Sequence, residues 1–298
     1  MSEPIIRALT VEELADALTL STAAGWNQRL DDWHQLLRMA PAGAFAAIID
    51  DRVVGTAIGI DYGGFAWIAM MLVDPHYRGR GLGRRLLEAA MDAVPPNRRI
   101  RLDATPLGRP LYERYGFEVE TTLSRHVSDG SNRGATPASD TCCGVQPISA
   151  ADLDAVIERD RLTFGGTRHA ALEWAFHSAP RYAHAVRSGT GVLQYCLGRE
   201  GRVFDQIGPV VAGDDLAAHA LVNAALDAAG SRPVAIDVFD SRTAFSASLQ
   251  ERGFVVERPL IRMCRAAESA ASRNGAAESA HDSSRRGHEL AIFGPEFG

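Results

Sequence analysis

Three glycines stand in one short loop of the sequence, interleaved with arginines and followed by an apolar helical pattern. The glycines are Gly79, Gly81 and Gly83, and the arginines are Arg78, Arg80, Arg84 and Arg85. A helix N-terminus presents unpaired backbone N–H groups and the positive end of the helix dipole. Glycine also lets the backbone close around an anion without Cβ clashes. The loop therefore predicts a binding site for a phosphate or a pyrophosphate.

The spacing of the loop excludes two common phosphate-binding motifs. Neither Lys-Ser nor Lys-Thr follows the glycines, so the P-loop pattern is absent. Glycines at 79, 81 and 83 also do not fit the dinucleotide-binding spacing G-x-G-x-x-G. A glycine triplet alone is equally typical of a structural turn, so the surrounding elements have to decide between the two interpretations.

The elements that would position this loop follow from the periodicity of apolar residues. Alternating or continuous apolar runs predict strands over residues 4–10, 44–50, 53–60, 65–73, 99–105 and 117–127. Spacings of three and four predict helices over residues 10–25, 26–40, 81–94 and 108–116, the first opened by a capping box of Thr10 and Glu13. This order predicts an α/β protein of the α+β layered kind, with helices on a mixed, largely β scaffold.

The same order of patterns occurs twice. Residues 128–140 are rich in Gly, Ser, Pro and Asn without periodicity, as in a flexible linker, and the opening pattern then returns. Matching positions are Leu86 and Leu221, Asp103 and Asp237, and Phe117 and Phe254, displaced by 135, 134 and 137 residues. We infer a tandem repeat, with a first domain at 1–127, a linker at 128–143, a second domain at 144–266 and a low-complexity tail at 267–298.

The glycine loop resembles the signature of a known enzyme family. Arg78-Gly79-Arg80-Gly81-Leu82-Gly83 is similar to the Arg-x-x-Gly-x-Gly motif of the GNAT N-acetyltransferase superfamily, and as in that family it follows a strand, which here ends Leu72-Val73-Asp74-Pro75. "LYERYGF", residues 111–117, resembles the family's closing Tyr-x-x-x-Gly-Phe segment. The resemblance covers nearly the whole first half. It implies two tandem GNAT-type domains, each a mixed, mostly antiparallel sheet flanked by helices.

By this resemblance, acetyl-CoA is the co-substrate. Its pyrophosphate would lie in the loop, and its pantetheine arm would pair with the backbone of the preceding strand. The implied cofactor-binding residues are Leu72, Val73, Arg78, Gly79, Arg80, Gly81, Leu82, Gly83 and Arg84.

The second half departs from the family pattern at the matching places. Positions displaced by 135 residues from the three glycines hold Asp214, Leu216 and Ala218, which put side chains and negative charge where a pyrophosphate would lie. Leu249 stands where the first half has Tyr112. We therefore expect a degenerate GNAT-like domain without a cofactor site. It would line or cover the substrate cleft, or serve the structure alone.

Acetyl transfer from a thioester to an amine needs a neutral amine, a donor for the developing oxyanion and a proton for the leaving thiolate. The resemblance assigns the last role, that of general acid, to Tyr112, although the residue also fits a half-buried structural aromatic. A backbone N–H near Leu72 or Val73 would polarise the thioester carbonyl.

The general base is harder to place, because the strand before the loop has no titratable side chain. Asp103 is the first candidate, and behind it stand Asp74, His34, His126, a residue of the second half or a relayed water. Asp103 fits equally well as a carboxylate that orders the turn after its strand. Its counterpart Asp237, in a half without catalysis, favours that structural role.

Trp26 and Asn27 are the predicted acceptor-binding residues, because they stand where GNAT proteins place the helix pair over the acceptor pocket. An apolar plate beside a polar group suits a small-molecule pocket. Trp33 fits the buried face of its helix instead. We expect acetyl transfer to the primary amine of a small molecule. The alternatives are acetylation of a protein lysine or N-terminus, and a non-catalytic acyl-CoA-binding sensor.

Composition limits the partners. A formal net charge of −6 and a pI of about 5.9 argue against nucleic acid or an anionic membrane as the partner. Neither a bilayer-spanning run nor a signal-peptide pattern is present, so we expect a cytoplasmic protein. The cysteines lack metal-ligand spacing and are expected to be free thiols without a metal: Cys142, Cys143, Cys196 and Cys264. The residues indicate no oligomeric state.

The sequence closes on a polar, low-complexity stretch at 266–289, expected to be disordered, followed by the apolar "LAIFGPEFG" at 290–298. Such a nonamer after a long tether would dock back onto its own protein, for example between the halves, or bind a partner. A vector remnant is the alternative for its last residues.

Overall fold

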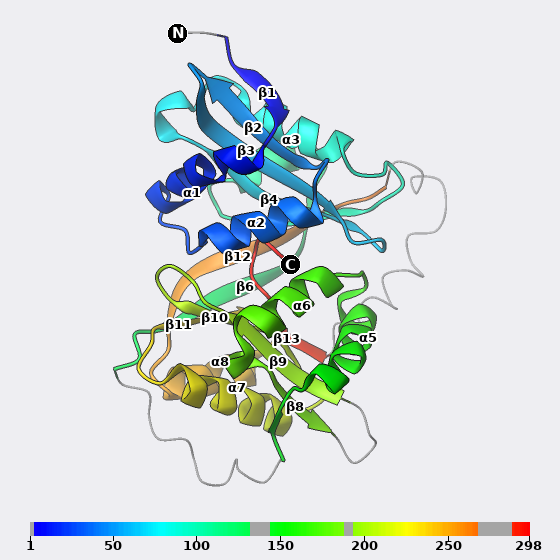
Figure 1. Cartoon of the computed structure of the whole chain (residues 1–298), viewed down its shortest axis with the longest axis vertical. Helices are drawn as coiled ribbons and strands as arrows, with labels where there is room; N and C mark the ends of the chain where they lie inside the picture. The colour runs from blue at the N-terminus through cyan, green and yellow to red at the C-terminus, as the bar shows by residue number, and fades with distance from the viewer. Residues whose placement is uncertain (1–2, 132–143, 188–192, 268–287) are drawn as a thin grey trace. The chain divides into compact units, whose positions relative to one another are not determined.

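The computed structural model describes residues 3–131, 144–187, 193–267 and 288–298 (Figure 1). The chain forms two compact units. The first comprises Met1–Asp103, Pro110–Glu118 and Met263–Arg273, and the second comprises Ala104–Arg109, Val119–Arg262 and Asn274–Gly298. Each unit combines a β-sheet with helices, which confirms the predicted α/β class.

The sheet of the first unit has the order β1-β2-β3-β4-β5. Its strands are β1 (Ile5–Ala8), β2 (Ala44–Ile49), β3 (Arg52–Asp61), β4 (Ala66–Val73) and β5 (Ile100–Ala104). Neighbouring strands are antiparallel except β4 and β5, which are parallel, so the sheet is mixed and mostly antiparallel as the family resemblance implied. Asp50 and Asp51 have φ of 48° and 58° and form a tight turn between β2 and β3.

Helices cover both faces of this sheet, since the eight interior residues of β3 are all buried. The helices of this unit are η1 (Val11–Glu13), α1 (Leu14–Ala23), α2 (Leu30–Met39), η2 (Pro75–Tyr77), α3 (Leu82–Asp92) and α4 (Arg109–Glu113). The predicted capping box is present, with the Glu13 carboxylate accepting the Thr10 N–H at 3.1 Å. Trp33 is fully buried, which confirms its predicted core position, and its indole N–H donates to Ser21 Oγ at 3.3 Å.

Two glycines of β3 let α3 lie directly on the sheet. A Cβ at Gly59 would lie 2.4 Å from the Ala90 carbonyl oxygen, and a Cβ at Gly55 would lie 2.9 Å from Leu86 Cδ1. Since Cβ atoms do not approach other atoms so closely, only glycine permits this packing. The start of α3 is thereby held at the end of β4, next to the glycine loop.

The second unit has the sheet order β12-β6-β11-β13-β10-β9-β8-β7. Its strands are β6 (Glu118–Ser128), β7 (Gln146–Pro147), β8 (His184–Arg187), β9 (Leu193–Arg199), β10 (Asp205–Val211), β11 (Val234–Phe239), β12 (Val255–Arg265) and β13 (Glu289–Ala291). Its helices are η4 (Ala150–Asp152), α5 (Leu153–Phe164), α6 (His169–Ser178), η5 (Pro180–Tyr182), α7 (Asp215–Ala229) and α8 (Thr243–Glu251). Apolar residues of α7 and α8, such as Leu221 and Phe245, form one core with Ile207 and Ile236 of the sheet.

The two halves of the sequence exchange their last strands. β6 ends the first half but pairs in antiparallel fashion with β11 of the second, over residues 123–128 and 234–239. In return, the end of β12, residues 263–265, belongs to the first unit, where the sheet order puts β12 next to β5, while residues 255–262 of β12 belong to the second unit. Sequence repeats and compact units are thus different divisions of this chain. The sequence could not predict the exchange, because two copies of one strand pattern can each pair with either copy of the neighbouring strand.

Parts of the predicted linker and tail, with Cys142 and Cys143, lie outside the described residues. Within the described part, Cys196 and Cys264 are thiols, as expected. None of the helices described there is long and apolar enough to cross a membrane.

Candidate functional site

A bulge separates the two parallel strands of the first unit. β4 and β5 pair at residues 66–67 and 100–101. Farther along, β4 holds one residue more than β3, and Met70 takes a φ of 52°. The Met70 carbonyl oxygen accepts a hydrogen bond from Thr56 Oγ1 at 2.7 Å. Because a bulge bends the strand and interrupts its pairing, the β4–β5 ladder of the described residues ends before it.

The bulge leaves one backbone edge of β4 turned toward β5. The Asp74 N–H donates to the Val54 carbonyl of β3 at 2.9 Å. Successive N–H groups of a strand point to opposite edges, so the Leu72 N–H also faces β3 and the Val73 N–H faces the β5 side. Of the two residues predicted to polarise a thioester, only Val73 therefore has its N–H on the β5 side.

The glycine loop connects η2 to α3. Asp74 Oδ1 accepts the His76 N–H at 2.9 Å and so caps η2. Gly79 and Gly81 have φ of 75° and 77°, in the left-handed region that favours glycine. No described atom lies within 4 Å of a Cβ built at either position, so the backbone angle, rather than crowding, requires glycine there.

The loop exposes the start of α3. Gly81 is the N-cap residue and offers no side chain to the N–H groups of the first turn. Arg78, Arg80 and Arg84 are exposed around it. Arg78 Nε donates to the Val73 carbonyl oxygen at 3.1 Å, and the Arg80 guanidinium lies 5.3 Å from the centroid of the Tyr77 ring. Bare backbone donors, a helix dipole and positive side chains together favour an oxyanion.

Tyr112 lies in α4 and is 7% exposed. Its ring meets Phe117 edge-on, with the centroids 6.0 Å apart, and the Phe117 N–H donates to the Tyr112 carbonyl oxygen at 3.2 Å. Burial raises the pKa of the Tyr112 phenol above its ordinary value, so the phenol keeps its proton at neutral pH. A protonated phenol meets the chemical requirement of the predicted general acid.

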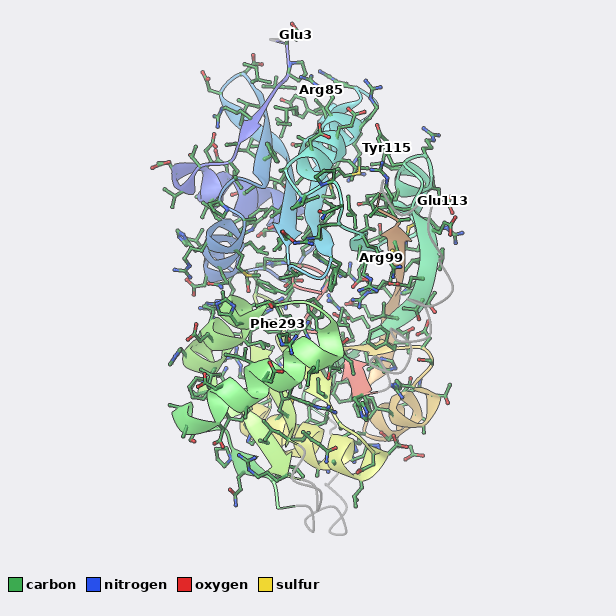
Figure 2. The ribbon with its side chains drawn as sticks, turned by 90° about the vertical axis from the view of Figure 1, so that its right-hand side faces the viewer. Glu3, Arg85, Arg99, Glu113, Tyr115 and Phe293 are labelled. Atoms are coloured by element: carbon green, nitrogen blue, oxygen red, sulfur yellow. The ribbon has the colours of Figure 1, made fainter. Side chains whose placement is uncertain are left out.

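Tyr115 is a supporting residue that the sequence did not single out. Its hydroxyl donates to Glu88 Oε1 of α3 at 2.6 Å, and Figure 2 shows Tyr115 near Glu113 at the end of α4. Partial loss of solvent and the Glu88 carboxylate raise the pKa of Tyr115. The bond ties the turn that follows Tyr112 to the helix that follows the glycine loop. A single hydrogen bond between two half-buried positions that are distant in the sequence leaves no pattern there.

The structure gives the candidate bases different surroundings. Asp103 is half-buried at the end of β5 and engages other residues. Its counterpart Asp237 is fully buried and accepts hydrogen bonds from Arg125 Nε and Nη2, each at 2.7 Å. Asp74 caps η2, as described above. His126 lies in the second unit, where its Nε2 is 2.7 Å from Ser246 Oγ.

Trp26 and Asn27 lie in the turn between α1 and α2. Asn27 is buried, Trp26 is half-buried, and the Trp26 N–H donates to the Ser21 carbonyl at 2.9 Å. Both residues make further interactions. The turn therefore packs into the first unit.

The second repeat closes the helix start that the first leaves open. Asp214 is the N-cap residue of α7, and its Oδ1 accepts the Ala217 N–H at 2.8 Å. A carboxylate of the chain thus takes the place that an anionic ligand would take. Ala218 and Leu249, the counterparts of Gly83 and Tyr112, are buried in the core of this unit.

The comparisons with known proteins match both halves. Family models described as "Acetyltransferase (GNAT) domain" match residues 41–119 and residues 156–277. The first match contains the glycine loop and Tyr112, and the second contains α7.

Three similar proteins extend over more of the chain. The uncharacterized N-acetyltransferase YitH of Bacillus subtilis is 28% identical over 247 residues, 82% of this chain and 85% of YitH. Holothin acyltransferase of a Pseudoalteromonas species is 30% identical over 57% of this chain and 56% of its own length. The crystal structure of an acetyltransferase candidate from Pyrococcus horikoshii has the same fold, with a TM-score of 0.73 and 22% identity over 100% of this chain and 97% of that one. The chain therefore belongs to the GNAT acetyltransferase superfamily, as an acyltransferase with two tandem GNAT domains.

Proposed function

We propose that the first repeat binds acetyl-CoA and transfers its acetyl group directly to the primary amine of a small molecule. One observation carries this proposal. The left-handed residues Gly79 and Gly81 open α3, and they follow η2 and β4, the strand that carries the bulge at Met70. An anion-binding helix start and an accessible strand edge thus adjoin, which suits a ligand with a pyrophosphate and an amide-containing arm.

The cofactor would lie along these two features. Backbone N–H groups of the loop, from Gly79 to Gly83, would bind the pyrophosphate, with Leu82 in the first turn of α3. The exposed arginines would add charge: Arg78, Arg80 and Arg84. The backbone of Leu72 and Val73 would pair with the pantetheine arm, as an added strand does.

Transfer then requires one bond to form and one to break. The amine nitrogen attacks the thioester carbon, and the carbon–sulfur bond breaks as the tetrahedral intermediate collapses. The Val73 N–H would stabilise the oxyanion, and Tyr112 would give its proton to the leaving thiolate. The burial that raises the pKa of Tyr112 also disfavours a free thiolate beside it, so the transfer stays feasible.

The amine would lose its proton to water, and solvent would return a proton to the Tyr112 phenolate. Asp237 is a structural ion-pair residue, and we assign its counterpart Asp103 the same kind of role. Asp103→Asn is therefore expected to lower the free energy of unfolding. The fall of kcat at acid pH, where the amine is protonated, should remain in this variant. If kcat no longer falls at acid pH in Asp103→Asn, Asp103 is the general base.

The acceptor side rests on Trp26 and Asn27. A half-buried indole beside a buried amide offers an apolar plate and a fixed polar group, which suits a small amine. The Pseudoalteromonas relative is named for the acylation of holothin, which supports acyl transfer as the reaction.

Titration calorimetry with acetyl-CoA tests the cofactor site. Gly81→Glu is expected to abolish binding, because it puts a carboxylate at the helix start. Gly63→Glu is the matched control, since Gly63 has a φ of 79° and equally open surroundings but lies in the turn between β3 and β4. Equal loss of binding in both variants would refute the assignment of the loop.

Release of free CoA from acetyl-CoA, measured with a panel of primary amines, tests the acceptor. Turnover with small amines supports the proposal. Turnover with a lysine peptide alone would overturn the acceptor and leave the cofactor site standing. Binding of acetyl-CoA without turnover on either class would favour a sensor instead.

A further inference from the structure

Residues 288–298 form part of the sheet of the second unit. β13 lies between β10 and β11, with Ala291 opposite both Val210 and Val238, and Figure 1 shows it in red among these strands. In the described residues, β10 and β11 pair directly only at their beginnings, residues 205–206 and 234–235. Docking onto the chain itself, one of the sequence-based alternatives, is thereby confirmed.

β10 and β11 correspond to β4 and β5 of the first repeat. Each pair is parallel and starts with two paired positions. Each first strand then has a bulge, at Met70 in β4 and between Ile207 and Val210 in β10. The segment 288–298 thus occupies the place where, under the proposed function, the first repeat holds the pantetheine arm.

The backbone of the segment forms hydrogen bonds with both neighbouring parts of the sheet, one at the end of β10 and one at β11. The Ala212 N–H donates to the His288 carbonyl oxygen at 2.8 Å, and the Ile292 N–H donates to the Asp237 carbonyl oxygen at 3.0 Å. Gly208, with a φ of 151°, belongs to the bulge, and a Cβ there would lie 2.0 Å from the Ile292 carbonyl oxygen. The strand is therefore shaped for a peptide at this position.

Two buried arginines hold the polar groups of the segment. Arg168 Nη2 lies 3.0 Å from Glu289 Oε1 and 2.8 Å from Asp160 Oδ1, and its Nη1 donates to the Gly298 carbonyl oxygen. Arg199 pairs with Glu296. All these side chains are at most 3% exposed. Charges so deeply buried require partners. The segment supplies one carboxylate to each arginine, Glu289 near its beginning and Glu296 near its end.

Aromatic side chains fill the space between these ion pairs. Phe293 and Phe297 are fully buried and stacked, with ring centroids 5.0 Å apart (Figure 2 labels Phe293). Trp174 of α6 lies 5.6 Å from the Phe297 ring and 6.4 Å from the Phe293 ring, measured between centroids. Two apolar anchors and two ion pairs are the features of a specific peptide complex.

We propose that the opening between β10 and β11 is a peptide-binding site whose ligand is the segment 288–298 of the same chain. In the second repeat, a strand of the chain lies where the first repeat would hold its cofactor. The Asp214 carboxylate caps the start of α7. The comparison with pantetheine rests on the proposed function, whereas the peptide site rests on the contacts of the second unit alone.

A protease site inserted between residues 268 and 287 of the full chain tests the proposal. After cleavage, the segment is expected to stay with the protein through gel filtration. A labelled synthetic peptide of residues 288–298 should replace it slowly and reach one peptide per chain. The same peptide with Glu289→Gln and Glu296→Gln should bind at least about 100-fold more weakly, because it removes one buried carboxylate from Arg168, which keeps Asp160, and one from Arg199.

Loss of the segment on cleavage, with hydrogen exchange in β10 and β11 unchanged, would overturn the proposal. So would equal binding of the neutralised peptide. No acetyl-CoA is needed, so this result is independent of the proposed function.

A point variant of the uncleaved chain keeps the test decisive if cleavage unfolds the unit. Glu296→Gln should speed hydrogen exchange of the Ile292 amide at least about tenfold. Glu251→Gln, at an exposed position of α8, is the matched control and should leave that exchange unchanged. Equal protection in both variants would count against the site.

Discussion

The Asp237 carboxylate of β11 accepts hydrogen bonds from Nε and Nη2 of Arg125 in β6, each at 2.7 Å. The two residues stand opposite each other in the β6–β11 ladder, and both side chains are buried. Arg125 belongs to the first half of the sequence, so the ion pair fastens the exchanged strand to the second unit. The carboxylate that the sequence matched with Asp103 has a structural role here.

Replacing Asp237 by Asn should lower the free energy of unfolding by about 3–5 kcal/mol, because the change leaves the Arg125 charge buried without its partner. Urea denaturation measures this loss. Asp240→Asn is the control, since Asp240 is exposed and accepts one hydrogen bond from Ser124 Oγ at 2.7 Å. Its loss should stay near 1 kcal/mol. Similar losses of unfolding free energy in the two variants would show that the buried ion pair stabilises the protein no more than an exposed hydrogen bond does.

Replacing Tyr112 by Phe should lower kcat by about 10²–10⁴-fold, as loss of a general acid does. The affinity for acetyl-CoA should stay close to that of the unchanged protein, because the ring and its packing on Phe117 remain. Since the pKa of Tyr112 is raised, its deprotonation should cause no fall of kcat below pH 10.

Tyr62→Phe supplies the control for this experiment. Tyr62 is another buried tyrosine of the first unit, in the turn between β3 and β4. Removal of the Tyr62 hydroxyl should change the free energy of unfolding and leave kcat nearly unaltered. A fall of kcat of the same size in both variants would remove Tyr112 from the mechanism.

Asp205 at the start of β10 should make the stability of the second unit depend on acid. Burial acts to raise the pKa of this carboxyl, but hydrogen bonds from Arg232, at 2.6 and 2.8 Å, and from Tyr182 outweigh burial and lower it. A lowered pKa in the folded state means that the stabilisation is present above the unfolded pKa and is lost as the pH falls through the folded value.

The free energy of unfolding should therefore decrease as the pH falls below about 4, and Asp205→Asn should flatten this decrease. The variant should also lose about 1–3 kcal/mol at neutral pH, the worth of charged hydrogen bonds. Denaturation between pH 2.5 and 7 measures both effects. Asp154→Asn, at an exposed position of α5, is the control. If the free energy of unfolding of Asp205→Asn decreases with falling pH as much as that of the wild type, groups other than Asp205 cause the decrease.

The sequence could predict the glycine loop because a left-handed backbone restricts the residue type. Gly79 and Gly81 have the φ values that such a loop needs, and the strand and helix around them lie where periodicity placed them. Trp33 was predictable for a related reason, since helical spacing fixes which side chains face the core.

The bulge at Met70 could not be predicted in this way. Methionine is not a residue type that signals positive φ, and the conformation is held by a hydrogen bond from Thr56 on the neighbouring strand. The place of residues 290–298 was equally hidden. Their apolar pattern shows only that they need burial, whereas the position between β10 and β11 depends on a bulge in another strand.

Replacing Gly59 by Ala should separate the packing of α3 from the chemistry of the loop. The added Cβ would lie 2.4 Å from the Ala90 carbonyl oxygen, so α3 has to move away from β3. Overpacking of this kind costs about 1–3 kcal/mol. Because α3 begins at the glycine loop, its shift should also weaken acetyl-CoA binding, although residue 59 itself lies in the interior of the sheet.

Gly63→Ala is the matched variant for this prediction. Its φ of 79° makes alanine unfavourable, at a cost of about 1–3 kcal/mol, but its surroundings are open and no helix has to move. Thermal unfolding should show a loss for both variants, and calorimetry on the folded proteins should show weaker acetyl-CoA binding for Gly59→Ala alone. If Gly59→Ala binds acetyl-CoA as tightly as Gly63→Ala, the position of α3 does not control the cofactor loop, and the loop has to be held by Asp74 and η2 instead.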